Sequence, residues 1–114
     1  MMDKRNYNLR MLLSILIVIT FLKPVHGQYI LKQAATQATL YNYAQAIPLY
    51  NKAYKRKASL NAARGLAESY RLTKDYVFAE SWYAKVVAIP EHAPEDKFHY
   101  AAVLMNNSKY AEAR

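Results

Sequence analysis

The sequence predicts an all-α fold of stacked antiparallel helix pairs, and two observations support this prediction. The chain has only two glycines and four prolines in 114 residues and is rich in Ala, Leu, Tyr and Lys, which favours helix over strand. Tyr43, Tyr76 and Tyr110 recur at almost even intervals, and an Ala stands three positions after each of them. A period in the low thirties is typical of stacked supersecondary units, so each unit is expected to be a pair of helices.

Residues 1–27 predict a secretory signal peptide. Basic residues occur up to Arg10, an uncharged run covers residues 11–22, and the small residue Gly27 ends the segment. A basic start, a short apolar core and a small residue at the exit are the parts of such a signal. The alternative is a retained membrane anchor, but crossing a bilayer takes about 20 apolar residues and this run is shorter. We therefore expect cleavage after Gly27.

Residues 28–58 predict the first helix pair. Pro48 lies a few residues into its second helix and, because it lacks a backbone donor, is expected to kink or tighten the first turns. The basic tract 55–57 has two interpretations, a nucleic-acid patch or cations that complement the negative end of a helix dipole. The second is favoured because an exported protein does not meet nucleic acid, so no nucleic-acid partner is expected.

Residues 59–92 predict the second helix pair, with helices over 61–72 and 76–89. Asp75 follows a break in the apolar pattern and is the expected N-cap of the later helix. Pro90 closes that helix, since a proline cannot continue the hydrogen-bond ladder.

Residues 93–114 predict a third unit that is cut short. Pro94 suits the first position of a helix, which places Glu95 and Asp96 at the positive end of the helix dipole. Stable stacks generally need about three or more repeats, and the chain has about two and a half. We therefore expect the chain to be the N-terminal part of a longer protein.

A set of Tyr, Ala and Leu residues at matching places in the units is predicted to pack the repeats. Small Ala side chains let two helices approach closely, and aromatic rings fill the space between neighbouring pairs. These residues are Ala46, Tyr50, Leu66, Ala67, Tyr70, Tyr76, Ala79, Tyr83 and Ala113.

The sequence resembles the tetratricopeptide repeat family. The segments that carry the resemblance are "YNYAQAIPLYNKAY" (residues 41–54), "GLAESYRLTKDYVFAESWYAKV" (65–86) and "YAAVLMNNSKYAEA" (100–113). The first unit departs from the family pattern, because Gln33 and Gln37 replace large apolar residues and Tyr41 occupies a turn position where the family often has Gly. Such irregularity suits a terminal, capping repeat. The resemblance implies a right-handed solenoid of about two and a half repeats with a concave face.

Four polar residues form the candidate ligand groove on that concave face. In the second unit they project from the side opposite Leu66 and Tyr70, and they are Asn61, Arg64, Glu68 and Arg71. Family members that bind peptide C-termini use basic and amide side chains on the concave face. The resemblance therefore implies that Arg64 and Arg71 could bind a carboxylate. The alternative is a solvated face on which Arg64 and Glu68 form an i, i+4 ion pair. That alternative is favoured, since the matching face of the first unit (Leu31, Ala35, Ala38) is apolar.

The sequence does not predict an enzyme, a metal site or a cofactor site. There is no cysteine, and His92 and His99 lack the i, i+4 spacing of a zinc motif. Glu91, Glu95 and Asp96 form one acidic cluster, in which the helix dipole explains Glu95 and Asp96. Two glycines cannot build a phosphate-binding or dinucleotide-binding loop.

A sharper resemblance concerns the cell envelope. The chain is similar to the start of a group of Gram-negative envelope proteins. The similarity lies in a signal that ends in "GQ" and in a later segment of the pattern "YRLTKDYVFAESWYAKV". Those proteins continue with a propeller-like β domain and an OmpA/MotB-type peptidoglycan-binding domain. This implies a non-enzymatic scaffold in the periplasm or outer membrane that binds a protein or peptide partner. Peptidoglycan or outer-membrane attachment would belong to domains absent from this chain. The alternative is a periplasmic or surface module that binds a peptide or glycan in the concave groove.

Overall fold

The computed structural model describes the backbone of residues 4–112 and the side chains of residues 8–14, 27–109 and 111. Within this part the chain is helical and contains no strand, so the all-α prediction is confirmed. The helices follow one another as α1 (Lys4–Thr39), α2 (Tyr43–Arg56), α3 (Leu60–Leu72), α4 (Tyr76–Val87) and α5 (Pro94–Glu112).

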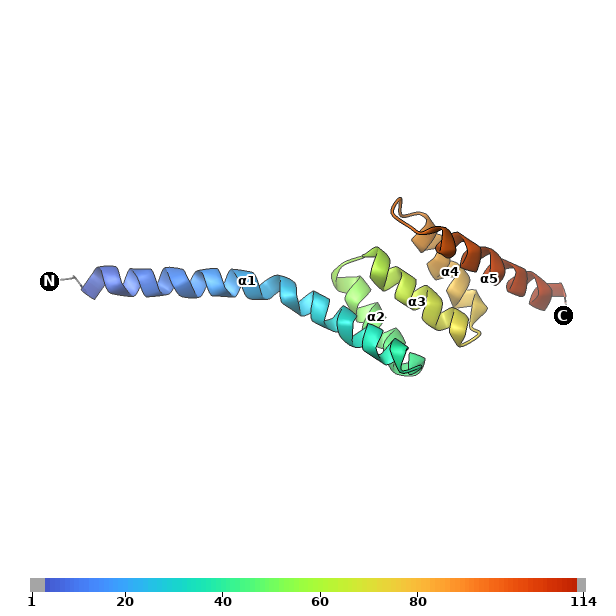
Figure 1. The fold of residues 1–114 in the computed structure, drawn as a ribbon, viewed down its shortest axis with the longest axis horizontal. Coiled ribbons are helices and arrows are strands. Elements are labelled where there is room, and N and C mark those ends of the chain that lie inside the picture. Colours follow the sequence, from blue (N-terminus) through green and yellow to red (C-terminus); the bar gives the residue numbers. More distant parts are fainter. Residues whose placement is uncertain (1–3, 113–114) are drawn as a thin grey trace.

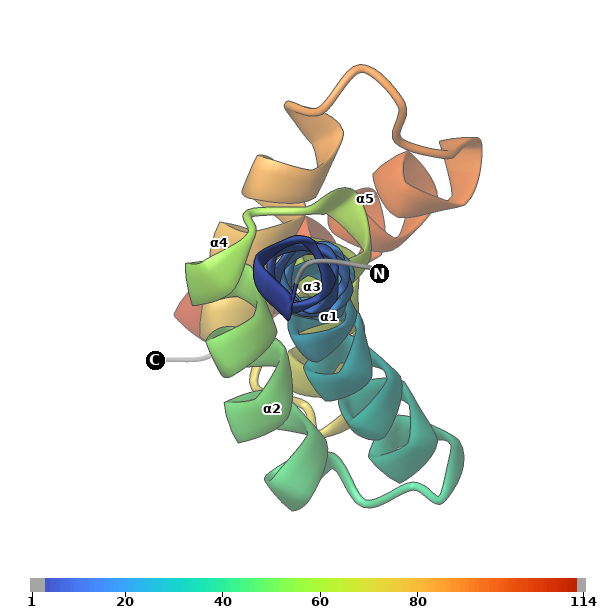
Figure 2. The ribbon, with the colours of Figure 1, turned by 90° about the vertical axis from the view of Figure 1, so that its left-hand side faces the viewer.

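Successive helices pack against one another, and α1 also contacts α3 (Figure 1). The C-terminal part of α1 lies beside α2 and the two helices run in opposite directions, as Figure 2 shows in a view along the N-terminal part of α1. The N-terminal part of α1 projects away from the other helices, which makes the molecule 85 Å long but only 29 by 19 Å across. The fold is therefore a row of helix hairpins in which α1 and α3 are neighbours.

The turns α1–α2 and α3–α4 have the same backbone geometry. Tyr41 has φ 57° and Lys74, at the matching place in the next hairpin, has φ 65°, so both residues are in the left-handed region. The amide of the next residue in each turn bonds back five positions, from Asn42 to Gln37 and from Asp75 to Tyr70, at 2.9 Å in both cases. This pattern is a Schellman motif, whose left-handed residue is usually Gly. The sequence had placed Tyr41 at a turn position where Gly is common, and its positive φ gives the physical reason for that preference.

The helix ends differ from the predicted ones by one or two residues. The helix expected over 61–72 begins at Leu60, because the Ser59 side chain caps it by accepting a hydrogen bond from the Ala62 amide at 3.2 Å. The helix expected over 76–89 ends earlier, at Val87. Asp75 is the N-cap residue of α4 as predicted, but its side chain makes no capping hydrogen bond.

Prolines and cations occupy the predicted places at other helix ends. Pro94 is the first residue of α5, with Glu95 and Asp96 in the first turn. Lys55 and Arg56 lie in the last turn of α2, where they complement the helix dipole. Pro48 lies inside α2, and the helix continues past it.

The core consists of small clusters that each join three helices. Ala34 of α1, Ala46 and Tyr50 of α2 and Leu66 of α3 form one cluster. A second cluster joins α3, α4 and α5 through Ala63, Ala67, Ala79, Tyr83, Val86 and Val103. Tyr70 and Tyr76 are half-buried beside it, and Ala113 lies outside the described residues.

Tyr50 of α2 fills the space beside Gly65 of α3. A Cβ placed on Gly65 would overlap the Tyr50 ring, whose Cδ1 would be 2.6 Å away. Tyr50 is 7% exposed, so its ring has little room to move. Gly65 is thus required for the close approach of α2 and α3.

The boundary between the predicted signal segment and the first repeat lies inside α1, which is continuous from Lys4 to Thr39. The axis of α1 bends about halfway along its length (Figure 1). Apolar side chains near its start, such as Leu9 and Leu12, are exposed. Among residues 4–112 no helix is both long and apolar enough to cross a membrane.

Candidate functional site

A hollow of about 400 Å³ lies between α1 and α3, and Tyr50 of α2 forms part of its wall. Three of the four residues of the predicted groove line it, namely Asn61, Arg64 and Glu68. The other lining residues are Gln28, Leu31, Lys32, Ala35 and Gly65. Leu31 and Ala35 belong to the apolar face that the sequence identified in the first unit, so the hollow joins the matching faces of the first and second hairpins.

Arg64 is held by an internal partner. Its Nε and one terminal nitrogen donate to the two carboxylate oxygens of Asp96 at 2.8 and 2.6 Å. The ion pair predicted between Arg64 and Glu68 is therefore wrong, because a bidentate acceptor from α5 takes up the guanidinium. The Arg64 side chain is 27% exposed and that of Asp96 is 3% exposed.

Asp96 has a larger role than the dipole interaction that the sequence suggested. Besides Arg64, it accepts a hydrogen bond from the Ala93 amide at 2.7 Å and so caps the start of α5. The hydrogen bonds from Arg64, together with the one from Ala93, lower the pKa of the Asp96 carboxyl although burial acts against them. The pair links α3 to α5 and fixes one side of the hollow.

Arg71 does not line the hollow. Its Nε donates to the hydroxyl of Tyr83 at 3.1 Å, which places its guanidinium against α4. Burial raises the pKa of the Tyr83 phenol, and the hydrogen bond from Arg71 opposes that rise. The sequence showed that Arg71 shares a helix face with Arg64, but not that the two arginines are taken up by different neighbours.

The hollow has mixed charge once these partners are considered. Asp96 neutralises Arg64, which leaves the exposed Lys32 and the half-buried Glu68 as the remaining charged groups of the lining. Burial, reinforced by the nearby Glu68 carboxylate, raises the pKa of Tyr50, whose hydroxyl stays a neutral donor. This arrangement suits a partner with both polar and apolar groups and does not form a clamp for a single carboxylate.

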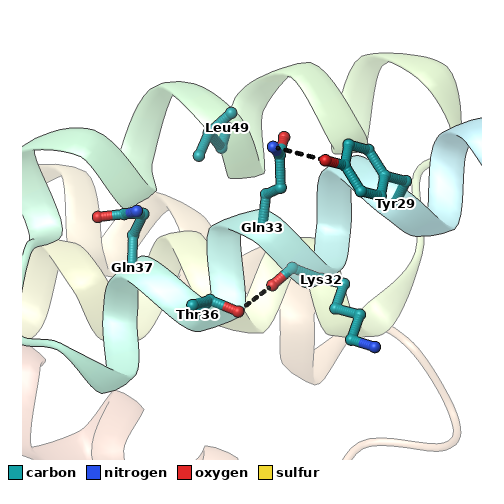
Figure 3. Close-up of a pocket in the computed structure, with 6 residues that line it drawn as sticks. All are labelled: Tyr29, Lys32, Gln33, Thr36, Gln37 and Leu49. Atoms are coloured by element: carbon teal, nitrogen blue, oxygen red, sulfur yellow. Dashed lines mark hydrogen bonds between the residues drawn. The ribbon is translucent and has the colours of Figure 1, made fainter.

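A second groove, of about 480 Å³, lies between α1 and α2 on the first hairpin (Figure 3). It is lined by Tyr29, Lys32, Gln33, Thr36, Gln37 and Leu49. The sequence had identified Gln33 and Gln37 only as departures from the apolar pattern. Two amides one helical turn apart, at places where the next unit has Leu66 and Tyr70, were the signal for this groove.

The histidines and acidic residues do not gather into a site. The Nδ1 atom of His92 lies 2.6 Å from the Ile89 carbonyl oxygen, and the His99 ring lies beside that of Tyr83 with centroids 6.2 Å apart. In the described residues no three His, Asp or Glu side chains are close enough together to hold a metal ion.

Comparisons with family models, with characterised proteins and with solved structures give no match for this chain. The geometry of the helices and of the grooves between them is therefore what bears on function.

Proposed function

We propose that this protein is a non-enzymatic interaction scaffold of the tetratricopeptide type, which binds a protein or peptide partner in the hollow between α1 and α3. The observation that carries the proposal is the recurrence of one hairpin geometry along the chain, with matching left-handed turns at Tyr41 and Lys74. Such repetition places first helices side by side and creates an extended binding surface, which is the usual role of stacked hairpins.

The proposal includes export to the periplasm or outer membrane of a Gram-negative bacterium. The support is the signal-like segment 1–27 and the resemblance of the repeats to the start of OmpA/MotB-type envelope proteins. In such a protein a downstream domain would bind peptidoglycan while the hairpins hold a partner. The exposed apolar side chains on α5, Phe98 and Met105, agree with a further helix packing there.

A second candidate is a peptide-binding or glycan-binding module that uses the same hollow. The mixed lining favours it, since Asn61, Glu68 and Lys32 offer both donors and acceptors. This candidate no longer depends on Arg64 and Arg71, because both guanidinium groups have internal partners.

The proposal is tested by filling the hollow. Ala35 is exposed and lines the hollow, whereas Ala44 is exposed on α2 and does not line it. The measured quantity is the amount of partner that copurifies with the full natural protein from the envelope. We expect Ala35→Trp to reduce this amount at least tenfold and Ala44→Trp to leave it unchanged. Equal recovery with both variants would exclude the hollow as the binding surface.

The coding frame beyond Arg114 tests the envelope part of the proposal separately. A completed third hairpin followed by a strand-rich domain and an OmpA-type domain would support it. A stop codon directly after Arg114 would contradict it, while the scaffold proposal would still depend on the tryptophan variants.

A further inference from the structure

The groove on the first hairpin lies at a place that is packed in the second hairpin. Leu66 and Tyr70 stand one repeat after Gln33 and Gln37, at the matching places of α3. Leu66 is fully buried against α1 and α2, and Tyr70 packs beside it. In the described residues no helix packs over Gln33 in the way that α1 and α2 pack over Leu66, and Gln33 is exposed.

Each glutamine in the groove uses only part of its amide inside the protein. Gln33 donates through Nε2 to the Tyr29 hydroxyl at 3.3 Å, which leaves its carbonyl oxygen able to accept (Figure 3). Gln37 accepts through Oε1 from the side-chain Nδ2 of Asn42 at 3.0 Å, which leaves its own NH₂ group able to donate. The two glutamines therefore offer the groove an acceptor from Gln33 and a donor group from Gln37.

The spacing of these amides fits an extended polypeptide. The two glutamines are four positions apart on one helix, which is about 6 Å along the axis. An extended chain repeats the direction of its N–H and C=O groups every second residue, or about 6.6–6.8 Å. The difference of less than about 1 Å is within the reach of glutamine side chains, so both amides can bond to the same face of one chain.

The walls of the groove indicate the side chains that such a peptide would carry. The 57% exposed Tyr29 and the half-buried Leu49 both line the groove, so the lining offers apolar surface to an apolar side chain of the peptide. Lys32 is the charged group of the lining, which contains no carboxylate. The peptide is accordingly neutral or acidic.

We infer that this groove is a second binding site, which holds an extended, neutral or acidic peptide segment of a partner through its main chain. The groove shares Lys32 with the hollow between α1 and α3, but its other lining residues differ, and a site there goes beyond the proposed function of that hollow. A glycan is less well suited, because the lining offers no carboxylate to accept from sugar hydroxyl groups.

The test uses the full chain labelled with ¹⁵N, and follows the side-chain NH₂ signals of Gln33 and Gln37. The probe is an acetylated octapeptide of alternating Val and Thr in which one Thr is replaced by Asp. The same peptide with alternate amide nitrogens methylated removes the main-chain donors on one edge and is the matched control. Chitotetraose serves as the glycan probe.

We expect the unmodified peptide to shift both NH₂ signals saturably and the methylated peptide to bind at least tenfold more weakly. Gln33→Met combined with Gln37→Met should weaken binding at least tenfold, and Gln37→Glu, which keeps a polar surface, should weaken it as well. Gln45→Met, on the exposed part of α2, should leave binding unchanged.

Backbone spectra report whether each variant is folded. Equal binding of the methylated peptide would overturn main-chain recognition, and unchanged affinity in the folded glutamine variants would overturn the location. Shifts caused by chitotetraose alone, or by neither probe, would overturn the peptide assignment. A failure here leaves the Ala35→Trp result untouched, since Ala35 lies in the other hollow.

Discussion

Replacing Asp96 by Asn tests whether the bond between α3 and α5 is a main support of the stack. Asn keeps the shape of the side chain and can still accept from the Ala93 amide, but it removes the charge that Arg64 faces. Glu95 is the matched control, because it lies in the same first turn of α5 but is exposed.

The expected loss follows from burial. A hydrogen bond to a charged group contributes about 1.5–3 kcal/mol, and leaving a buried charge unpaired costs about 3–5 kcal/mol. Asp96 is 2% exposed, but the Arg64 side chain is 27% exposed and water can partly replace its partner. We therefore expect Asp96→Asn to lower the free energy of unfolding by about 2 kcal/mol. Glu95→Gln loses a dipole interaction of about 0.3–1 kcal/mol and a weak attraction between the exposed Glu95 carboxylate and Arg64, so its loss should be the smaller one.

Urea unfolding followed by circular dichroism measures these differences. A double-mutant cycle with Arg64→Met isolates the pair, and a coupling energy within the range of about 0.5–3 kcal/mol is expected for residues in contact. Equal losses in Asp96→Asn and Glu95→Gln, or a coupling energy of zero, would refute the reasoning.

The same pair makes a prediction about pH. The pKa of Asp96 is lowered in the folded protein, chiefly by the hydrogen bonds from Arg64. A carboxyl with a lowered pKa stabilises the fold fully above its unfolded pKa of about 3.9, and this stabilisation is lost as the pH falls through the folded value. The stability advantage of the natural protein over Asp96→Asn should thus be constant from about pH 7 to 5 and shrink below about pH 4. An advantage that persists unchanged at about pH 3 would contradict the assignment.

Three further predictions concern other parts of the chain. Gly65→Ala should lower the free energy of unfolding by about 1–3 kcal/mol, because the new methyl group overlaps the Tyr50 ring; an unchanged thermal midpoint would contradict this. Lys74→Gly should raise the free energy of unfolding by about 0.5 kcal/mol, because it relieves the left-handed strain at φ 65° at some cost in unfolded-chain entropy, and urea midpoints would reveal the opposite sign. The exported protein should begin at Gln28, and an intact mass that retains residues 1–27 would exclude cleavage there.

The sequence predicted the helices well because their signals are local or periodic. The periodic recurrence of Tyr and Ala located both hairpins, and Pro94 marked the first residue of α5. Even the unusual turn at Tyr41 had a sequence signal, because its place in the repeat is one that favours Gly.

The site was harder to predict, because its contacts join residues far apart in sequence. Arg64 lies on α3 and Asp96 on α5, and only the packing of α5 against the preceding helices brings them together. Helical spacing suggested Glu68 as the local partner of Arg64, but an i, i+4 pair is worth only about 0.2–0.5 kcal/mol and a buried bidentate acceptor outweighs it. The same holds for Arg71, whose partner Tyr83 comes from the next helix.

The central claim is that a partner enters the hollow between α1 and α3, and site-specific photocrosslinking tests it most directly. A benzoylphenylalanine would replace Asn61, which is exposed and lines the hollow, or Lys52, which is exposed on α2 outside both grooves. Irradiation of cells that produce the full natural protein should give one discrete protein adduct from position 61 and none from position 52. Adducts from both positions alike, or from position 52 alone, would contradict the claim.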